Sequence, residues 1–447
     1  MFRTVELPLW LLVLVLLFAA VTFASHFLFP SVRWFFRRRM ERVVAKLNDR
    51  LERPIQPFKL ARRYDMIQRL IYDPKVAEAI SEHADEAGIP DNVAFEEAKR
   101  YAREIVPRFS ATAYFGFAIR VARFLSRALY RVHLNERNEA ALKAIDSDAT
   151  IIFVMNHRSN MDYVLVTYLV AERSALSYAV GEWARIWPLS GLIRAMGAYF
   201  IRRKSRNTLY RRVLARYVQL ATAGGVTQAV FPEGGLSLDG SVGPPKLGLL
   251  SYILADFEPG GRDVVFVPVA LNYDRVLEDR ILTGAAQAGN RKFRTSIFGA
   301  MWFVIRYVTR RILRRAVRFG HAGVGYGTPM SLNAFLDGQP DGAIKKVGEA
   351  LRGRIKDVIP VLPVPLVAYV LLRGDGPMTR EALVKAVVPY LQRLDDEAMQ
   401  DANAVVEDAL ANMLSRRMLR EGPDGVRPLS EGQVLVEYYA RSIEHLF

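Results

Sequence analysis

The stretch TIIFVMNHRSNMDY, residues 150–163, joins a short apolar run to a dense group of polar residues. Its first part, residues 150–155, is almost entirely apolar, which is typical of a strand buried in a sheet. A histidine, an arginine, a serine, two asparagines and an aspartate then follow within residues 156–163. Because unpaired polar groups are costly in a protein core, we expect the strand to end here at a functional site.

Four further apolar runs follow along the chain, and each of them ends at Gly, Pro or a polar residue. They are residues 174–181, 226–234, 263–273 and 321–327. Helical patterns lie between these runs. Strands that alternate with helices indicate an α/β domain, with a largely parallel sheet and helices on its faces. We place this domain at residues 136–335.

The regions on both sides of this domain, residues 36–135 and 336–447, are predicted to be mainly helical. One exception is VIPVLPVPLVAYVLL, residues 358–372, which contains three prolines. It is too short to span a membrane as a helix, and prolines interrupt helices. We therefore expect a buried connection there.

An apolar segment near the amino terminus, Leu7 to Phe29, contains no Asp, Glu, Lys or Arg. It is long enough to cross a bilayer as a helix, so we expect residues 1–35 to form a transmembrane anchor with a basic flank. Arginines are concentrated after the segment, which places the rest of the chain on the cytoplasmic side of an inner membrane. A cleaved signal peptide is the alternative, but the segment is long for one and its amino-terminal region is weakly basic.

The charge of the chain is strongly basic, with 62 Lys and Arg against 46 Asp and Glu and a net charge of +16 over 447 residues. This balance indicates an anionic partner, such as anionic lipid, an acidic carrier protein or nucleic acid. No zinc-ligand spacing or RNA-binding motif accompanies the charge, so we do not expect nucleic acid. The chain contains no cysteine, which excludes disulfides, thiolate metal sites and a cysteine nucleophile.

His157 and Asp162 are the candidates for acid–base chemistry. On one continuous helix, five residues would separate them by about 140°, so they meet only if a turn lies between them. The expected junction between strand and helix provides that turn. An aspartate that accepts the imidazole Nδ1–H fixes the tautomer, which leaves the other nitrogen to take a proton from a substrate hydroxyl. Ser159 is nearby, but this chemistry needs no enzyme nucleophile.

Two downstream stretches add groups that suit an anionic ligand. Arg202 and Arg203 end an apolar run and could clamp a phosphate with their forked donors, whereas Arg211 and other arginines beyond them fit a solvated helix face. The sequence FPEGG then predicts a tight turn at Glu233 and Gly234, where backbone N–H groups can approach a ligand. Glu233 would either orient a substrate hydroxyl or hold the loop through a backbone bond.

A third stretch, FVPVALNYDR at residues 266–275, carries Pro268 between two valines. It fits an apolar wall for an acyl chain or thioester. An ordinary core strand with an edge proline explains the same residues equally well.

Four stretches of the chain resemble, in their order, the four blocks of the glycerolipid acyltransferase family: NHRSNMDY, GAYFIRR, FPEGG and VPVALNYD. The nearer match is to the bacterial membrane-bound glycerol-3-phosphate acyltransferases. The resemblance covers about residues 156–275. It implies transfer of a fatty acyl group from acyl-CoA or acyl-ACP to a glycerol-phosphate hydroxyl, without a metal or bound cofactor. It further implies that His157 is the base and Asp162 its orienting partner. The acceptor phosphate would contact Arg203 and Arg202, while Glu233, Gly234 and Pro268 would complete the site.

The chain departs from this family after the Glu-Gly-Gly turn, where the nearer relatives carry two arginines and this chain carries Leu236 and Leu238. Two cations are therefore missing where an anionic head group is expected. Lys246 is expected to replace part of the charge, and Lys204 is a further candidate. Alternatively, the acceptor differs and is a lysophospholipid such as lysophosphatidate, dihydroxyacetone phosphate or another amphipathic alcohol.

Residues 302–318 contain six arginines and no acidic residue. Arginines four apart would form a stripe on a helix, which predicts contact with anionic membrane lipid or with an acidic carrier protein. A solvated helix packed on the domain is the alternative. From a different class of function, a non-catalytic membrane-bound scaffold would also explain an anchored, basic chain.

Overall fold

The computed structural model contains two compact units, Met1–Ile55 and Gln56–Phe447. The residues that it describes are 8–135, 138–170, 173–181, 189–202, 205, 207–289, 306–307, 309–310, 313, 318–336, 343–394 and 399–447. Most of the basic segment at residues 302–318 therefore lies outside the described residues, as do Arg203 and Lys204.

The first unit is built on one long helix, α1 (Leu9–Asn48), which continues through the boundary expected at residue 35. After the helix, the backbone N–H of Ile55 donates a hydrogen bond of 2.9 Å to the side-chain oxygen of Asn48. In the part of the chain that the structure describes, we find no helix with the length and apolar composition that crossing a membrane requires.

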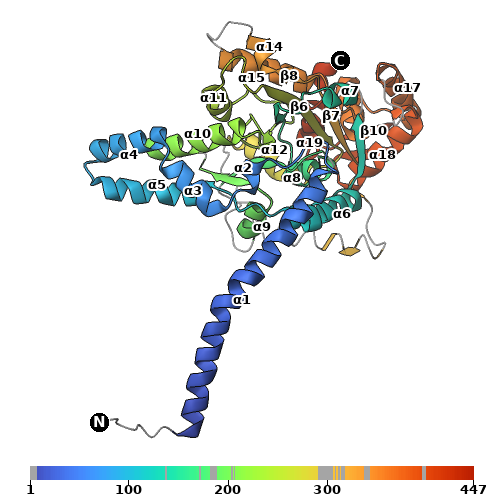
Figure 1. Ribbon diagram of the computed structural model, residues 1–447. Coiled ribbons are helices and arrows are strands. Elements are labelled where there is room, and N and C mark those ends of the chain that lie inside the picture. The colour runs from blue at the N-terminus through green and yellow to red at the C-terminus, as the bar shows by residue number, and fades with distance from the viewer. Residues whose placement is uncertain are drawn as a thin grey trace, which may run out of the picture. The chain divides into compact units, whose positions relative to one another are not determined.

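The second unit contains the expected α/β sheet (Figure 1). Its strands are β1 (Arg131–Asn135), β2 (Thr150–Met155), β3 (Ser177–Gly181), β4 (Tyr199–Ile201), β5 (Gln228–Val230), β6 (Val264–Tyr273), β7 (His321–Tyr326) and β8 (Met330–Ser331). They are arranged in the order β1-β7-β6-β2-β5-β3-β4, with β8 beside β6. The five strands from β6 to β4 run parallel to one another, whereas β7 and β8 are antiparallel to β6 and β1 is parallel to β7. The prediction of a largely parallel sheet is confirmed.

The five expected strands are present, and every residue of β2 and of β6 is buried. Three strands of this sheet, β1, β4 and β8, were not among the expected runs. β1 directly follows a helix and is only partly buried, so its residues lack a continuous apolar run, and β4 and β8 have only three and two residues. These weak patterns left the three strands without a clear signal.

Helices precede the sheet and lie between its strands. Before the sheet come α2 (Pro57–Leu60), α3 (Arg63–Ile71), α4 (Pro74–Ala87), α5 (Asp91–Ile105), a π-helical segment (Thr112–Ala118) and α6 (Ile119–Leu129). Between the strands lie α7 (Glu139–Lys143), α8 (Met161–Leu169), α9 (Leu189–Ala195), α10 (Thr208–Ala223), α11 (Gly248–Leu254) and α12 (Asp279–Gln287). The sequence determines where α4 begins. Asp73 accepts the N–H of Lys75, and Pro74 occupies the first turn, where no N–H donor is needed.

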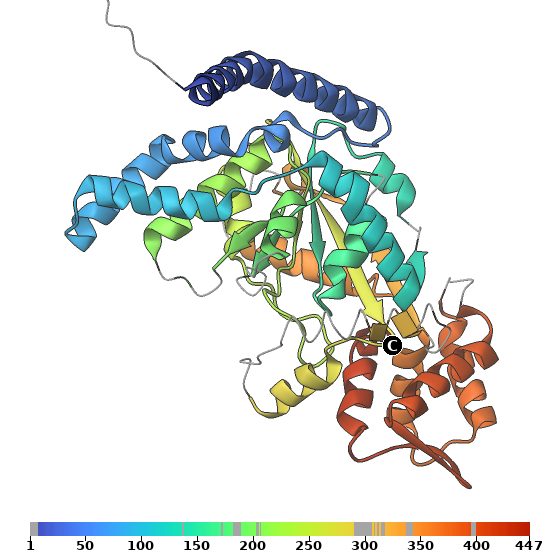
Figure 2. The same ribbon diagram turned by 90° about the horizontal axis from the view of Figure 1, so that it is seen from below.

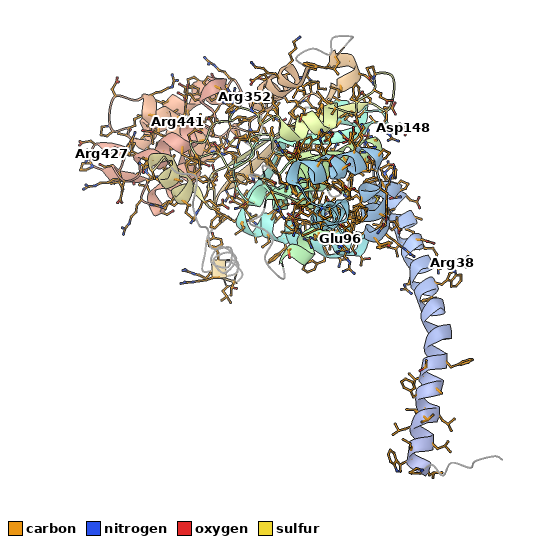
Figure 3. All side chains as sticks on the ribbon, turned by 90° about the vertical axis from the view of Figure 1, so that its left-hand side faces the viewer. Arg38, Glu96, Asp148, Arg352, Arg427 and Arg441 are labelled. Carbon is orange, nitrogen blue, oxygen red and sulfur yellow. The ribbon has the colours of Figure 1, made fainter. Side chains whose placement is uncertain are left out.

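The carboxyl-terminal region is mainly helical, as expected. It contains α14 (Leu332–Leu336), α15 (Ala343–Lys356), α16 (Pro363–Arg373), α17 (Arg380–Leu391), α18 (Ala402–Ser415), the hairpin β9 (Leu419–Gly422) and β10 (Gly425–Pro428), and α19 (Gln433–Ala440). Figure 2 shows the long strand β6, in yellow, ending close to these orange and red helices. Charged side chains such as Asp148, Arg427 and Arg441 are exposed on this unit (Figure 3).

One expectation in this region is wrong. Residues 363–373, within the segment expected to be a buried connection, form the helix α16, and the residues from Pro363 to Leu371 are buried. Two of its prolines, Pro363 and Pro365, lie in the first helical turn, where a backbone N–H has no acceptor within the helix. The prolines therefore start this helix and do not break it.

Pro268 lies on β6, which is an interior strand and not an edge strand. On one side it pairs with Val154 of β2. On the other side β8 pairs with β6 up to Phe266 and β7 pairs with it from Val269 onward, so Pro268 falls in the gap between the two neighbours. A residue without an N–H is tolerated in an interior strand at such a gap.

Candidate active site

The polar residues that follow β2 and β5 meet at one edge of the sheet. These two strands are parallel neighbours, and β6 is the other parallel neighbour of β2. The carboxyl ends of all three strands therefore face the same way. In open α/β sheets, ligands bind outside the carboxyl ends of the strands, which makes this edge the candidate site.

His157 and Asp162 are in direct contact, because the turn between β2 and α8 brings them together. The imidazole Nδ1 is 2.9 Å from Oδ2 of Asp162, and the side chains are 3% and 0% exposed. A carboxylate accepts hydrogen bonds, so in the neutral imidazole the proton lies on Nδ1 and Nε2 carries the lone pair. Among the described residues, none is hydrogen-bonded to Nε2 of His157.

Asp162 is held by three other donors. Its Oδ2 also accepts the backbone N–H groups of Arg158 at 2.7 Å and Ser159 at 3.0 Å. Its Oδ1 accepts the hydroxyl of Tyr273, the last residue of β6, at 2.7 Å. Burial and the nearby Asp162 charge raise the pKa of Tyr273 well above its usual value, which keeps the phenol protonated as a donor. This network fixes the carboxylate that orients His157.

Aromatic rings surround the imidazole. Phe231, the residue after β5, stacks on His157 with 4.2 Å between ring centroids and 28° between the planes. Tyr163 of α8 meets the same imidazole edge-on at 5.5 Å. These contacts restrict the rotation of the ring and shield it from bulk water, so they supply further orientation for a base.

Glu233 acts on the backbone, which is the second of its two expected roles. One carboxylate oxygen accepts the N–H of His157 at 2.9 Å and the other accepts the N–H of Gly243 at 3.1 Å. The loop makes a return contact, since the N–H of Ser237 donates to the carbonyl of His157 at 2.8 Å. Burial raises the pKa of Glu233 to about 7, against the opposing effect of these hydrogen bonds.

Ser159 has a structural role in this turn. Its hydroxyl donates to Glu278 at 2.8 Å and accepts the N–H of Met161 at 3.1 Å. Glu278 also accepts the N–H and the side-chain amide of Asn160. Glu278 could not be predicted from the sequence, because it lies 119 residues beyond Ser159 and belongs to no recognisable pattern.

A cavity of about 240 Å³ opens beside Tyr163 and Phe231, the two rings that contact His157. Its polar lining includes Arg202, Arg211 and Lys246, and its apolar lining comes from β3, β5, α10 and α11. Arg211 was expected on a solvated helix face, and although it is exposed, it also lines this cavity. The cavity thus combines positive charge with an apolar wall.

Two of the predicted cations have partners that the sequence did not indicate. Arg202 forms two hydrogen bonds, of 2.9 and 2.7 Å, with the carboxylate of Glu104 on α5. Lys246 passes over Gly234, whose φ of +65° favours glycine, and an added Cβ there would lie 2.8 Å from the Lys246 side chain. The backbone N–H of Lys246 donates to Pro232 at 2.7 Å, which closes the FPEGG loop.

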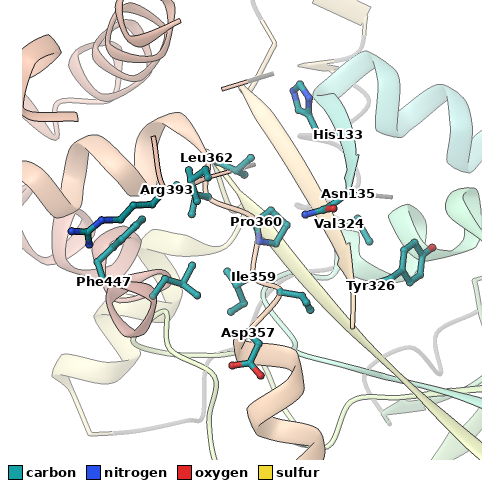
Figure 4. A pocket seen from close by; sticks show the side chains of 14 residues that line it. His133, Asn135, Val324, Tyr326, Asp357, Ile359, Pro360, Leu362, Arg393 and Phe447 are labelled. Carbon is teal, nitrogen blue, oxygen red and sulfur yellow. The ribbon is translucent and has the colours of Figure 1, made fainter. Parts of the chain in front are cut away.

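Leu236 and Leu238 are partly buried and pack against the hydrophobic core. They therefore serve the packing of the loop and supply no charge. A second cavity, of about 230 Å³, lies elsewhere in the unit and is lined by His133, Tyr326, Asp357, Arg393 and Phe447 among others (Figure 4). None of the predicted site residues lines it.

Two family models match parts of this sequence. Residues 131–272 match the family model described as Acyltransferase, and residues 302–447 match the model of the Glycerol-3-phosphate acyltransferase C-terminal region. The first match contains the turn after β2, the FPEGG loop and most of β6. The second contains α16, α18 and α19.

Curated relatives include the glycerol-3-phosphate acyltransferases of Pseudomonas entomophila (strain L48), 28% identical, and Pseudomonas aeruginosa (strain LESB58), 27% identical, each over 419 residues. Both alignments cover 87% of this chain and 49% of the relative, so the chain spans about half the length of these relatives. A solved structure of the 1-acyl-sn-glycerophosphate (LPA) acyltransferase PlsC from Thermotoga maritima is 20% identical, with a TM-score of 0.33 over 54% of this chain and 77% of that one. The two family models and these relatives therefore identify an acyltransferase domain at residues 131–272 of this chain, followed at residues 302–447 by a carboxyl-terminal region of the glycerol-3-phosphate acyltransferase type.

Proposed function

We propose that this chain transfers a fatty acyl group from an acyl thioester to a hydroxyl group of glycerol 3-phosphate. The observation that carries the proposal is the His157–Asp162 pair, held 2.9 Å apart at the carboxyl ends of parallel strands and next to a cavity with cationic and apolar walls. The family models and the names of the curated relatives support the same reaction class.

In the proposed reaction, Nε2 of His157 removes the proton of the acceptor hydroxyl while its oxygen attacks the thioester carbonyl carbon. Asp162 stabilises the resulting imidazolium through Nδ1. The tetrahedral adduct then collapses, the carbon–sulfur bond breaks, and the leaving thiolate takes the proton from Nε2. The products are an ester and a free thiol, and His157 returns to its starting state.

We assign the acceptor phosphate to the cavity beside Phe231, with Lys246 and Arg211 as its cations. Lys246 comes from the segment after the FPEGG loop and Arg211 from α10, so together they provide charge at a site where Leu236 and Leu238 provide none. Arg202 contributes positive potential, although its guanidinium is bound to Glu104. Arg203 stays a predicted phosphate ligand.

Because Leu236 and Leu238 supply no charge, a different phosphate-bearing acceptor is the alternative. Lysophosphatidate carries the same phosphate and one acyl chain, and dihydroxyacetone phosphate carries the phosphate without the chain. All three acceptors present a phosphate and a hydroxyl group, so the cationic cavity suits each of them. Acyl-CoA and acyl-ACP present the same thioester, so both are proposed as acyl donors.

We further propose that the chain acts at the cytoplasmic face of the inner membrane and that α1 attaches it there. Leu9, Trp10 and Phe18 of α1 are 79%, 65% and 74% exposed, and insertion into lipid would remove this apolar surface from water. If residues 1–35 are deleted, the chain should move from the membrane fraction to the supernatant. Retention of the shortened chain in membranes would contradict the role of α1.

The test of the reaction is an assay of the full chain in detergent. Each donor is offered with glycerol 3-phosphate, lysophosphatidate and dihydroxyacetone phosphate in turn, and the lipid product is identified by mass spectrometry. Turnover of lysophosphatidate alone would replace the proposed acceptor, and absence of transfer to every acceptor would favour a non-catalytic scaffold. Full activity of a His157→Ala variant would contradict the proposed base.

A further inference from the structure

Arg158, the residue after the proposed base, is enclosed in the protein with only 2% of its surface exposed. One guanidinium nitrogen, Nη1, donates to the carbonyl of Gly240. The guanidinium carbon lies 4.8 Å from the centroid of the Tyr438 ring on α19. The other two nitrogens, Nε and Nη2, have no hydrogen-bond partner among the described residues. The aromatic face of Tyr438 is therefore a main source of stabilisation for this buried cation.

Gly240 shows how closely the three segments approach one another. Its φ of +93° is a conformation that favours glycine. A Cβ atom added at Gly240 would lie 1.9 Å from the carbonyl oxygen of Tyr438 and 3.3 Å from Nη1 of Arg158. The loop after β5 thus touches α19 at the same point where it binds Arg158. Its Ser237 also binds the carbonyl of His157, at 2.8 Å, so one loop connects α19 to the proposed base.

The next residue of α19, Tyr439, reaches the catalytic turn by a second route. Its hydroxyl donates to the carboxylate of Asp279 and accepts the backbone N–H of Val276 at 2.9 Å. The neighbouring Glu278 binds Ser159 and Asn160 of the turn. The consecutive tyrosines of α19 therefore hold two different parts of the segment that carries His157 and Asp162.

We propose that Tyr438 and Tyr439 are positioning residues of the acyltransferase site, and that the carboxyl-terminal region fixes the turn at residues 156–162 in its reactive geometry. Neither tyrosine touches the reacting atoms. Tyr438 acts through Arg158 and Gly240, and Tyr439 acts through Asp279 and Glu278. The kinetic consequences of this inference rest on the proposed function, whereas its structural consequences do not.

The kinetic test compares two variants of one residue in the full chain. Tyr438→Leu removes the ring over Arg158, and we expect kcat to fall by about tenfold or more while KM for both substrates changes by less than about twofold, because misplacement of a base affects the chemical step. Tyr438→Phe keeps the ring and should retain wild-type rates, since the Tyr438 hydroxyl has no hydrogen-bond partner in the described part of the chain. Glu437→Gln changes a neighbouring residue of α19 that binds Gln433 and is the matched control.

The structural test needs no substrate. The backbone N–H groups of Arg158 and Ser159 donate hydrogen bonds to Asp162. Their hydrogen exchange should be faster in Tyr438→Leu and unchanged in Tyr438→Phe. If the wild type shows no acyl transfer, the proposed function fails while this measurement still decides the positioning role. Unchanged exchange and unchanged kcat in folded Tyr438→Leu would overturn the inference, and so would an equal loss of kcat in Tyr438→Phe.

Discussion

Glu233 and His157 are joined by a hydrogen bond of 2.9 Å between a side-chain carboxylate oxygen and a backbone N–H, although 76 residues separate them in the chain. The bond does not reach the imidazole. It fixes the backbone from which the imidazole projects, and the second oxygen of Glu233 holds Gly243 in the same way. Glu233 of the FPEGG loop therefore supports the proposed base through its backbone and not through its imidazole ring.

Glu233→Gln should reduce both activity and stability. The amide of glutamine has one accepting oxygen, so its NH₂ group must face one of the two N–H donors that Glu233 binds. We expect a loss of about 1–3 kcal/mol in the free energy of unfolding. We also expect a lower kcat, measured per folded molecule. Glu431→Gln, at an exposed position, is the control and should leave both quantities unchanged.

Asp162→Asn should lower kcat far more than Tyr273→Phe does. The asparagine variant loses the charge that stabilises the imidazolium and can present an NH₂ group to His157, so a loss of about 10³–10⁴-fold is expected. Tyr273→Phe removes one donor to Asp162 and leaves the other three, which predicts a loss of about tenfold. Steady-state kinetics at saturating substrate will rank the two variants, and a larger effect of Tyr273→Phe would contradict the assigned roles.

Arg211→Gln should raise KM for glycerol 3-phosphate with little change in KM for the acyl donor. Loss of one charged contact to a phosphate is expected to raise KM by about tenfold or more. Arg212→Gln provides a matched control on the same helix, since Arg212 contributes nothing to the cavity lining and lies 3.7 Å from Glu82. Equal effects of the two substitutions would indicate general electrostatic attraction and no specific contact.

Asp274 should make the chain less stable as the pH rises from about 4 to 8. Burial raises the pKa of this carboxyl from its usual 3.8 to about 7, although it accepts the N–H groups of Val364 and His321. The folded state therefore holds a proton that the unfolded state has released, so raising the pH through this range lowers the free energy of unfolding. The contribution of Asp274 is on the order of 3–4 kcal/mol over the whole range.

The measurement is urea unfolding of the wild type and of Asp274→Asn across this pH range. The variant cannot ionise at residue 274, so its stability should depend less steeply on pH than that of the wild type. Identical slopes for the two proteins would show that the Asp274 carboxyl does not hold its proton in the folded state.

The sequence by itself determined the elements with strong periodic patterns and the order of the motifs. The apolar runs identified β2, β3, β5, β6 and β7, because strands buried in a parallel sheet carry continuous apolar residues. The turn after β2 identified His157 and Asp162, since a pair only five residues apart is set by local geometry. Residues 363–373 show the limit of such patterns, because prolines suit the first turn of a helix as well as a loop.

Only the tertiary structure decided which distant residues support that turn. Tyr273, Glu233, Glu278 and Tyr438 each come from a different segment, and each acts through contacts that exist only in the folded chain. The sheet brings the carboxyl ends of its parallel strands to one edge, and α19 packs close to that edge. The spacing of residues in the sequence does not indicate contacts between distant segments. His157 could therefore be predicted as the base, whereas most of the residues that hold its turn in place could not.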